Sequence, residues 1–313
     1  MSNIHRISDF QNDSRHHGHQ GRGILSMNIS GPRHNDNVPF LSNIPSHLIL
    51  KFLGSDQGHN DPRKASVGAM FKETCCPSFR LVSFTSLFAI IIIAMFIVSC
   101  AWRGLVIPSR DFLTPKYETL TEFGNRDYFL IRNKFQVWRL LTAAFLHANF
   151  LHLFFNLISI LAIGSQIERI IGTTKTIVVF SLSAIGGNLF GAVASHAPAV
   201  GSSTAIFGLL GCFAGYIIIN WNRVEAQTKC YMITMISFVI VMNIMFGIGN
   251  TRGSGSQADN SGHLGGLITG CFVGMAIINP IGGAHSSYEI RIKRFGLLFT
   301  LIFLSICTFL LFK

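Results

Sequence analysis

The chain has 313 residues, of which 49% are hydrophobic and 12% are charged, whereas an average soluble domain has about 25% charged residues. The mean hydropathy of +0.45 excludes an ordinary soluble enzyme, a disordered protein and a fibrous protein. The formal net charge of +11 comes from Lys and Arg residues scattered through loops and a polar N-terminal segment. This pattern is typical of charges that flank a membrane, and nucleic-acid binding is not expected.

The first 80 residues form a polar segment that is expected to be a disordered tail. No apolar stretch follows Met1, so a cleaved signal peptide is not expected. The tract His16-His17-Gly18-His19 has no carboxylate or cysteine partner in register, which argues against a metal site. Cys75 and Cys76 lie just before the first apolar run and are either unreactive thiols or acceptors for S-palmitoylation. The seven cysteines are odd in number and most lie in or beside apolar runs, so no disulfide framework is expected.

Seven apolar runs follow, each close to the ~20 residues that an α-helix needs to span a bilayer. They lie near residues 81–101, 141–163, 174–195, 203–221, 231–249, 262–280 and 295–312. A transmembrane β-barrel would show alternating segments of about ten residues instead. The sequence therefore predicts an all-α polytopic membrane domain over residues 81–312.

The link at 102–140 is much longer than the other connections between the runs. A link of this length is uncommon without a function of its own. Its aromatic residues predict an element at the membrane interface, with four side chains at headgroup depth: Trp102, Tyr117, Tyr128 and Trp138.

The distribution of Lys and Arg in the short loops predicts the orientation. The loops after the second, fourth and sixth runs hold seven of these residues, whereas the loops after the third and fifth hold only Arg252. Since positive loops face the cytoplasm, we expect a cytoplasmic N-terminus. The link at 102–140 would then lie outside the cell or in a lumen.

Three polar clusters interrupt the apolar runs, where polar groups are costly and often functional. The first contains His147, His152 and Asn156. His152 and Asn156 are four residues apart and share a helical face, whereas His147 is expected to tie the start of the helix to the preceding loop. An alternative interpretation is a hydrogen-bond network that only holds helices together.

The second cluster, Val200–Gly208, begins the fourth run. A serine at the first turn of a helix can be a simple N-cap. However, Gly201 allows a tight turn, and a helix start offers free N–H groups and a positive dipole end, which suit an oxyanion. Small residues recur beside Ser203 at helical spacing and permit close packing with a neighbouring helix: Thr204, Gly208, Gly211 and Gly215.

The third cluster, Asp259–Gly266, begins the sixth run. His263 shares a face with Gly266 and Gly270, so its helix can also approach a partner closely. Histidine is the usual base that activates a serine, which predicts a Ser203–His263 dyad. Asp259 is the nearby acidic candidate for a third member, but it is expected to cap the turn instead.

The remaining roles in this predicted site follow from the same chemistry. The oxyanion would be held by the Ser203 N–H together with the side chains of Asn156 and His152. Only one of the adjacent serines 202 and 203 can face His263, and the local pattern of small residues favours Ser203.

Together these motifs resemble the rhomboid family of intramembrane serine proteases. The matching pieces occur in the family's order and are Trp138-Arg139, His147-x4-His152-x3-Asn156, Gly201-Ser202-Ser203-Thr204-Ala205-Ile206-Phe207-Gly208 and His263-Leu264-Gly265-Gly266. The family usually has Gly-Ala-Ser-Gly around the serine and Ala before the histidine. This chain has a different small residue at three of these positions: Ser202, Thr204 and Gly262.

The resemblance implies Ser203 as the nucleophile and His263 as the general base, with His152 and Asn156 at the oxyanion. Structural residues near that site would be His147, Trp138, Arg139, Gly201 and Gly266. The fold implied is a six-helix core plus one C-terminal transmembrane helix, with no cofactor. Substrates would be single-span transmembrane proteins in the lipid bilayer of the secretory pathway or plasma membrane. The stretch from Leu113 to Arg139 is similar to apicomplexan parasite rhomboids.

Two other classes of protein compete with this interpretation. A catalytically inactive rhomboid-like protein would bind and escort membrane proteins, but such proteins typically lack the serine or the histidine. A channel or transporter would use buried polar residues to line a path, but the sequence has no paired intramembrane carboxylates and no broken inverted repeats.

Overall fold

Long apolar α-helices make up most of the chain that the structure describes. The computed structural model describes residues 82–107, 112–250, 259–282 and 286–313, and within them β-structure is limited to two isolated bridges. The prediction of an all-α membrane protein is therefore confirmed. The polar tail 1–80, with its histidine tract and Cys75 and Cys76, lies outside the described residues.

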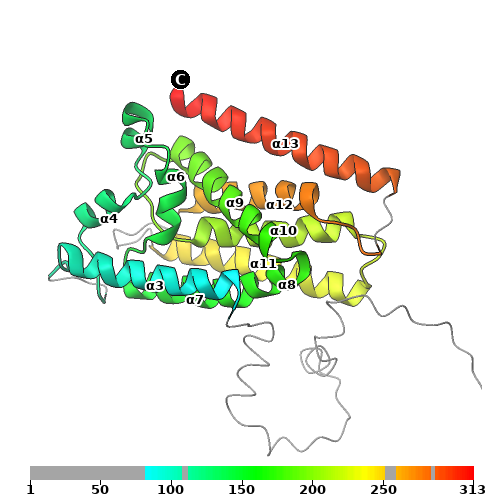
Figure 1. Ribbon diagram of the computed structural model, residues 1–313, viewed down its shortest axis with the longest axis horizontal. Helices are drawn as coiled ribbons and strands as arrows, with labels where there is room; N and C mark the ends of the chain where they lie inside the picture. Colours follow the sequence, from blue (N-terminus) through cyan, green and yellow to red (C-terminus); the bar gives the residue numbers. More distant parts are fainter. Residues whose placement is uncertain (1–81, 108–111, 251–258, 283–285) are drawn as a thin grey trace, which may run out of the picture. The chain divides into compact units, whose positions relative to one another are not determined.

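Helices occupy all seven apolar runs of the sequence (Figure 1). In chain order the helices are α3 (Phe84–Trp102), α4 (Tyr117–Phe123), α5 (Tyr128–Lys134), α6 (Arg139–Thr142), α7 (Phe150–Ser159), α8 (Ser165–Ile171), α9 (Thr173–Ala194), α10 (Ser203–Ile219), α11 (Ala226–Asn250), α12 (Asn260–Ile277) and α13 (Ser287–Phe312). A 3-10 turn, Ala143–Phe145, follows α6, and a π-helical turn, Ile160–Gly164, joins α7 to α8.

Four of the described helical stretches are long and apolar enough to cross a membrane: Phe84–Trp102, Phe150–Ile171, Thr173–Ala194 and Ser287–Phe312. The apolar parts of α10 and α11 are shorter, at Ser203–Ile219 and Ala226–Val241. Membrane crossing by α10, α11 and α12 therefore stays a prediction.

Two helices begin at residues that the apolar runs of the sequence do not mark. The second long helix begins at Phe150 and not near residue 141, because the Asn149 side chain accepts a hydrogen bond from the backbone N–H of His152 and caps the helix there. The last helix begins at Ser287 and not near residue 295, because Ser286 and Glu289 form a capping box. Capping of this kind is invisible to a hydropathy pattern, so the apolar runs near 141–163 and 295–312 do not mark these helix starts.

Close contact between glycine-bearing helices forms the centre of the fold. Helix α10 packs against both α9 and α12 (Figure 1). A Cβ added at Gly270 would lie 1.9 Å from the carbonyl oxygen of Gly208, and one added at Gly266 would lie 2.1 Å from that of Thr204. The backbones of α10 and α12 therefore touch along the small-residue faces that the sequence predicted.

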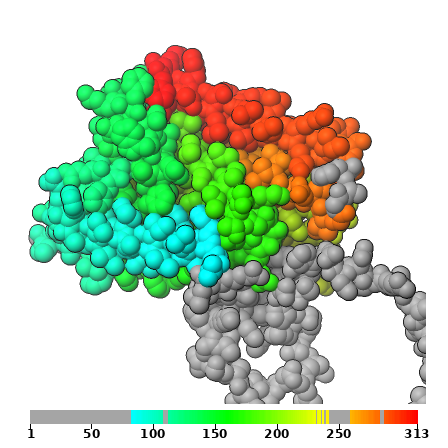
Figure 2. Space-filling model, in the orientation of Figure 1, coloured from blue at the N-terminus to red at the C-terminus, as the bar shows by residue number. Residues whose placement is uncertain are grey.

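The last helix packs along the sixth. Figure 2 shows α13 (red) lying against α12 (orange). At their crossing, a Cβ added at Gly296 would lie 2.6 Å from the carbonyl oxygen of Phe272, and the ring of Phe272 stacks on that of Phe299 at 3.8 Å. The C-terminal helix is thus a packed part of the helical bundle.

The link at 102–140 is itself folded and contains α4, α5 and α6. Three of its aromatic side chains are at least half exposed, as an interfacial position requires: Trp102, Tyr117 and Trp138. Tyr128 differs from the prediction, because it is only 7% exposed and stacks on His196 at 3.9 Å. It belongs to a second apolar cluster, in which α5 packs against α9 and the end of α13.

A buried carboxylate caps the start of α3. Glu168, in α8, accepts hydrogen bonds from the backbone N–H groups of Phe84 (2.8 Å) and Thr85 (3.1 Å) and from the hydroxyls of Thr85 (3.1 Å) and Thr173 (2.8 Å). The carboxylate therefore satisfies N–H groups that a helix start leaves without intrahelical partners.

We expect Glu168→Ala to lower the free energy of unfolding by about 1–3 kcal/mol, because it leaves several buried donors unsatisfied. Denaturant unfolding of the purified protein in detergent micelles measures this. Glu225→Ala is the matched control, since Glu225 is exposed. Equal stabilities of the two variants would contradict the prediction.

Candidate active site

Ser203 and His263 come together at the starts of two touching helices. Ser203 is the first residue of α10, and His263 lies in the first turn of α12. The Oγ of Ser203 lies 2.7 Å from Nε2 of His263, which is hydrogen-bond distance. The glycine contacts between α10 and α12 allow this approach, because larger side chains would hold the two helix starts apart.

Phe207 completes the surroundings of the imidazole and was not predicted from the sequence. Its ring stacks on that of His263 at 4.6 Å with an interplanar angle of 4°. Phe207 lies four residues after Ser203, so both side chains are on one face of α10. The four-residue spacing could have predicted this contact, but a phenylalanine in an apolar run is usually an ordinary core residue.

The adjacent serines point in different directions. Ser202 is fully buried, and its hydroxyl donates a 3.1 Å hydrogen bond to Oδ1 of Asn156. The amide nitrogen of Asn156 donates in turn to the backbone carbonyl of His152 at 2.8 Å. Ser202 thus ties the start of α10 to α7, which leaves Ser203 as the serine that faces the imidazole.

His152 approaches the same point across Gly201. Gly201 has a φ of +125°, which residues with a side chain rarely adopt, and its N–H donates to the carbonyl of Ala143 at 2.9 Å. A Cβ at this position would lie 2.8 Å from Nε2 of His152 and 3.6 Å from Oγ of Ser203. Only glycine therefore lets the imidazole of His152 reach the region beside Ser203.

The other predicted residues fall into two groups. His147 lies in the loop before α7, is fully buried and contacts the ring of His152 edge-on at 5.3 Å. Gly266 contacts the backbone of Thr204. Arg139, in contrast, supports the folded link, since it donates to the backbone carbonyls of Thr121 and Asn125.

Trp138 is 54% exposed, and no described contact brings Trp138 or Arg139 to the Ser203–His263 pair. The described contacts of Arg139 therefore place it in the link at 102–140, and the proximity of these two residues to the site stays a prediction.

Asp259 caps α12 and is also held by an arginine that sequence reasoning missed. Its Oδ1 accepts a 3.1 Å hydrogen bond from the N–H of Gly262, which is the turn cap that we expected. Both of its oxygens also bind the guanidinium of Arg126, at 2.5 and 3.2 Å. Arg126 is 1% exposed and lies 133 residues earlier in the chain, so no local pattern could have paired the two.

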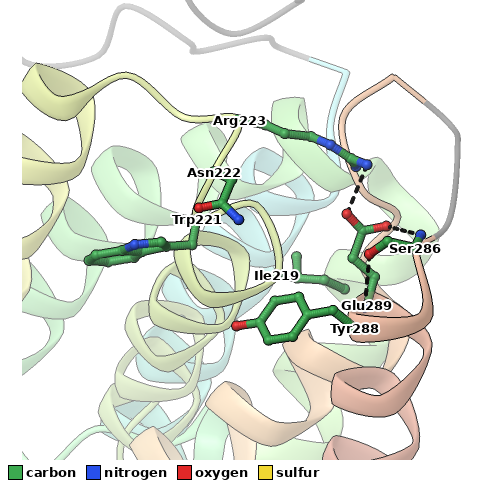
Figure 3. A pocket seen from close by; sticks show the side chains of 7 residues that line it. All are labelled: Ile219, Trp221, Asn222, Arg223, Ser286, Tyr288 and Glu289. Atoms are coloured by element: carbon green, nitrogen blue, oxygen red, sulfur yellow. Dashed lines mark hydrogen bonds and ion pairs between the residues drawn. The ribbon is translucent and has the colours of Figure 1, made fainter.

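The arrangement offers a hydroxyl nucleophile and a base, and no metal cluster accompanies it. Within the described residues, no group of three or more His, Cys, Asp or Glu side chains could hold a metal ion. A cavity of about 170 Å³ lies at the opposite end of α10, between Trp221 and an ion pair of Arg223 with Glu289 at 2.8 Å (Figure 3). It is remote from Ser203 along the helix and takes no part in this site.

Comparisons with known proteins converge on one family. A family model described as the Rhomboid domain matches residues 134–280, which include Ser203 and His263. Rhomboid-like protease 1 of Toxoplasma gondii is 36% identical over 212 residues, covering 67% of this chain and 69% of that protein. Rhomboid-like protease 3 of the same organism is 36% identical over 57% of this chain and 63% of its own length. Rhomboid protease GluP of Bacillus subtilis is 35% identical over 53% of this chain and 31% of its own length.

Proposed function

The chain belongs to the rhomboid family, whose proteases act on membrane proteins within the bilayer, and on that premise we propose that it is an intramembrane serine protease with a Ser203–His263 dyad. The observation that carries the proposal is the 2.7 Å contact between Oγ of Ser203 and Nε2 of His263. A nucleophile within hydrogen-bond reach of its base is the geometric requirement for this chemistry.

The proposed reaction proceeds in two halves. Oγ of Ser203 attacks the carbonyl carbon of the peptide bond while its proton passes to Nε2 of His263. The imidazolium then gives that proton to the leaving amine, which departs and leaves an acyl ester on Ser203. In the second half, His263 takes a proton from water, the resulting hydroxide attacks the ester, and the carboxylic acid product leaves as Ser203 regains its proton.

Three groups are proposed to stabilise the oxyanion that forms in each half. The N–H of Ser203 is free at the first turn of α10, where the helix dipole also favours negative charge. His152 lies beside Gly201 and Ser203, and Asn156 lies beside Ser202. Such donors are worth most where water is largely excluded and their positions are fixed in advance.

The proposed substrates are single-span transmembrane proteins. A peptide bond inside a transmembrane helix is hydrogen-bonded, so the helix must unwind before Ser203 can attack. Helix-weakening residues should therefore mark the cleavage region. In the orientation that the basic loops favour, the N-terminus is cytoplasmic and cleavage takes place toward the outer face of the membrane.

Reconstitution of the full chain in liposomes tests this proposal. A single-span reporter with glycines in its helix is expected to be cut within that helix, as mass spectrometry of the products would show. A matched reporter with leucines in place of the glycines should be cut at least about tenfold more slowly, because each glycine weakens a helix by about 1 kcal/mol. If neither reporter is cut and Ser203 does not react with a fluorophosphonate probe, the chain is not a protease, and the escort role becomes the better explanation.

Asn156→Ala tests the proposed oxyanion site separately. We expect kcat to fall by about 100- to 1,000-fold with a smaller change in KM, which is the usual cost of one lost oxyanion donor. Ser159→Ala, one turn further along α7, is the matched control and should leave kcat unchanged. A kcat for Asn156→Ala within a factor of two of the wild-type value would exclude Asn156 from this role.

A further inference from the structure

Arg126 occupies an unusual place in the folded link. It lies between α4 and α5, outside the segment 134–280 that the family model matches. It is nevertheless 1% exposed. Helix α9 leaves room for it, because a Cβ added at Gly191 would lie 2.0 Å from Nη1 of Arg126. A buried charge of this kind is costly unless it is paired and hydrogen-bonded.

Arg126 holds the segment that leads into Ser203. Its backbone N–H donates to the carbonyl of Ala199 at 2.9 Å, and the N–H of Ala199 donates back to the carbonyl of Arg126 at 3.0 Å. Its Nη2 also donates to the carbonyl of Ala197 at 3.2 Å. Ala199 is four residues before Ser203, so these three bonds fix the chain just before α10 begins.

The same residue holds the start of the helix that carries His263. Nη1 and Nη2 bind the two oxygens of Asp259, which is four residues before His263 and caps α12. A bidentate pair of this kind fixes orientation as well as distance, and a lysine ammonium cannot reproduce it.

From these contacts we propose that Arg126 is a positioning residue that sets the geometry of the Ser203–His263 pair by binding both chain segments that lead into it. The inference rests on the proposed function, since its effect on rate requires that the pair be catalytic. The glycine contacts fix how closely α10 and α12 approach, and Arg126 fixes their first turns relative to each other. A misplacement of about 1 Å in such a pair can cost about 100-fold in rate.

Replacement of the ion pair tests the proposal through activity. Asp259→Asn keeps an oxygen that can cap α12 but removes the negative charge and the second acceptor oxygen that bind Arg126. We expect Arg126→Gln and Asp259→Asn each to lower kcat by about 10- to 100-fold with little change in KM. The double variant should be no slower than either single variant, because each substitution breaks the same Arg126–Asp259 ion pair. Arg126→Lys should be intermediate.

The exposed Arg103–Glu122 ion pair in the same link supplies the matched control. The guanidinium hydrogen bond from Arg103 lowers the pKa of the Glu122 carboxyl, so the pair is intact at neutral pH. Arg103→Gln is expected to leave kcat unchanged. The proposal would be overturned if the falls in kcat of Arg126→Gln and Asp259→Asn were additive in the double variant. It would also be overturned if the variants changed KM alone.

Hydrogen exchange provides a measurement that does not depend on activity. In Asp259→Asn, exchange should accelerate at residues 197–200 as well as at 259–263, because Arg126 connects the two segments. Acceleration confined to 259–263 would overturn the proposal. If the wild-type protein cuts neither reporter and Ser203 does not react with the fluorophosphonate probe, the proposed function fails, while the exchange result still decides whether Arg126 couples the two segments.

Discussion

Ser203→Ala is expected to lower kcat for a transmembrane reporter by at least about 10,000-fold, as loss of the nucleophile does in serine proteases. The Oγ of Ser203 contacts Nε2 of His263, so the two side chains should act as one unit. His263→Ala should therefore cost about as much as Ser203→Ala, and the double variant should be no slower than either one. Initial rates in liposomes, with the products identified by mass spectrometry, provide the measurement.

Ser202→Ala is the matched control for this prediction. The two serines are adjacent and chemically identical, but the hydroxyl of Ser202 donates to Asn156 and does not face the imidazole. Its removal should cost less than about tenfold in kcat, because the net value of one neutral hydrogen bond is about 1 kcal/mol. Equal cleavage by wild type and Ser203→Ala would contradict the dyad hypothesis. If Ser202→Ala were inactive while Ser203→Ala stayed active, Ser202 and not Ser203 would be the nucleophile.

The parts of the site that carry a local sequence pattern were the parts that sequence could predict. Ser203 and His263 each stand at a helix start followed by small residues, and this local pattern predicted both the helices and their close packing. The structure brings the two side chains together, while their catalytic roles stay a prediction. His152 and Asn156 were paired by their four-residue spacing and by the family resemblance, and both lie beside the start of α10.

The failures have two physical causes. Hydropathy cannot locate a cap, so the apolar run near 141–163 gave no sign that a helix begins directly after Asn149. Contacts distant in sequence leave no local pattern, so the pairing of Arg126 with Asp259 was missed, and Tyr128 was assigned to the membrane interface although it packs against α9 and α13. Both Arg126 and Tyr128 lie in the link at 102–140, where no local sequence pattern indicated these contacts.

The helix contact that underlies the site also limits what α12 can tolerate. Gly270 lies two turns after His263, and a Cβ added there would lie 1.9, 2.4 and 2.5 Å from three backbone atoms of Gly208. Backbone atoms in the middle of a helix cannot move aside as a flexible side chain can. The helices must therefore separate if any side chain is present at this position.

We expect Gly270→Leu to leave no folded protein and Gly270→Ala to lower the free energy of unfolding by about 1–3 kcal/mol through overpacking. The loss in Gly270→Ala should occur although alanine is favoured over glycine in a helix by about 1 kcal/mol. Gly274→Ala is the matched control one turn further along α12, where the nearest atom to the added Cβ is Cα of Cys212 at 3.0 Å. It should be less destabilised than Gly270→Ala in the same denaturant titration.

Separation of α10 from α12 also separates Ser203 from His263. The kcat of Gly270→Ala should therefore fall together with its free energy of unfolding. A Gly270→Ala variant with wild-type stability and wild-type kcat would show that the two helices do not need this contact.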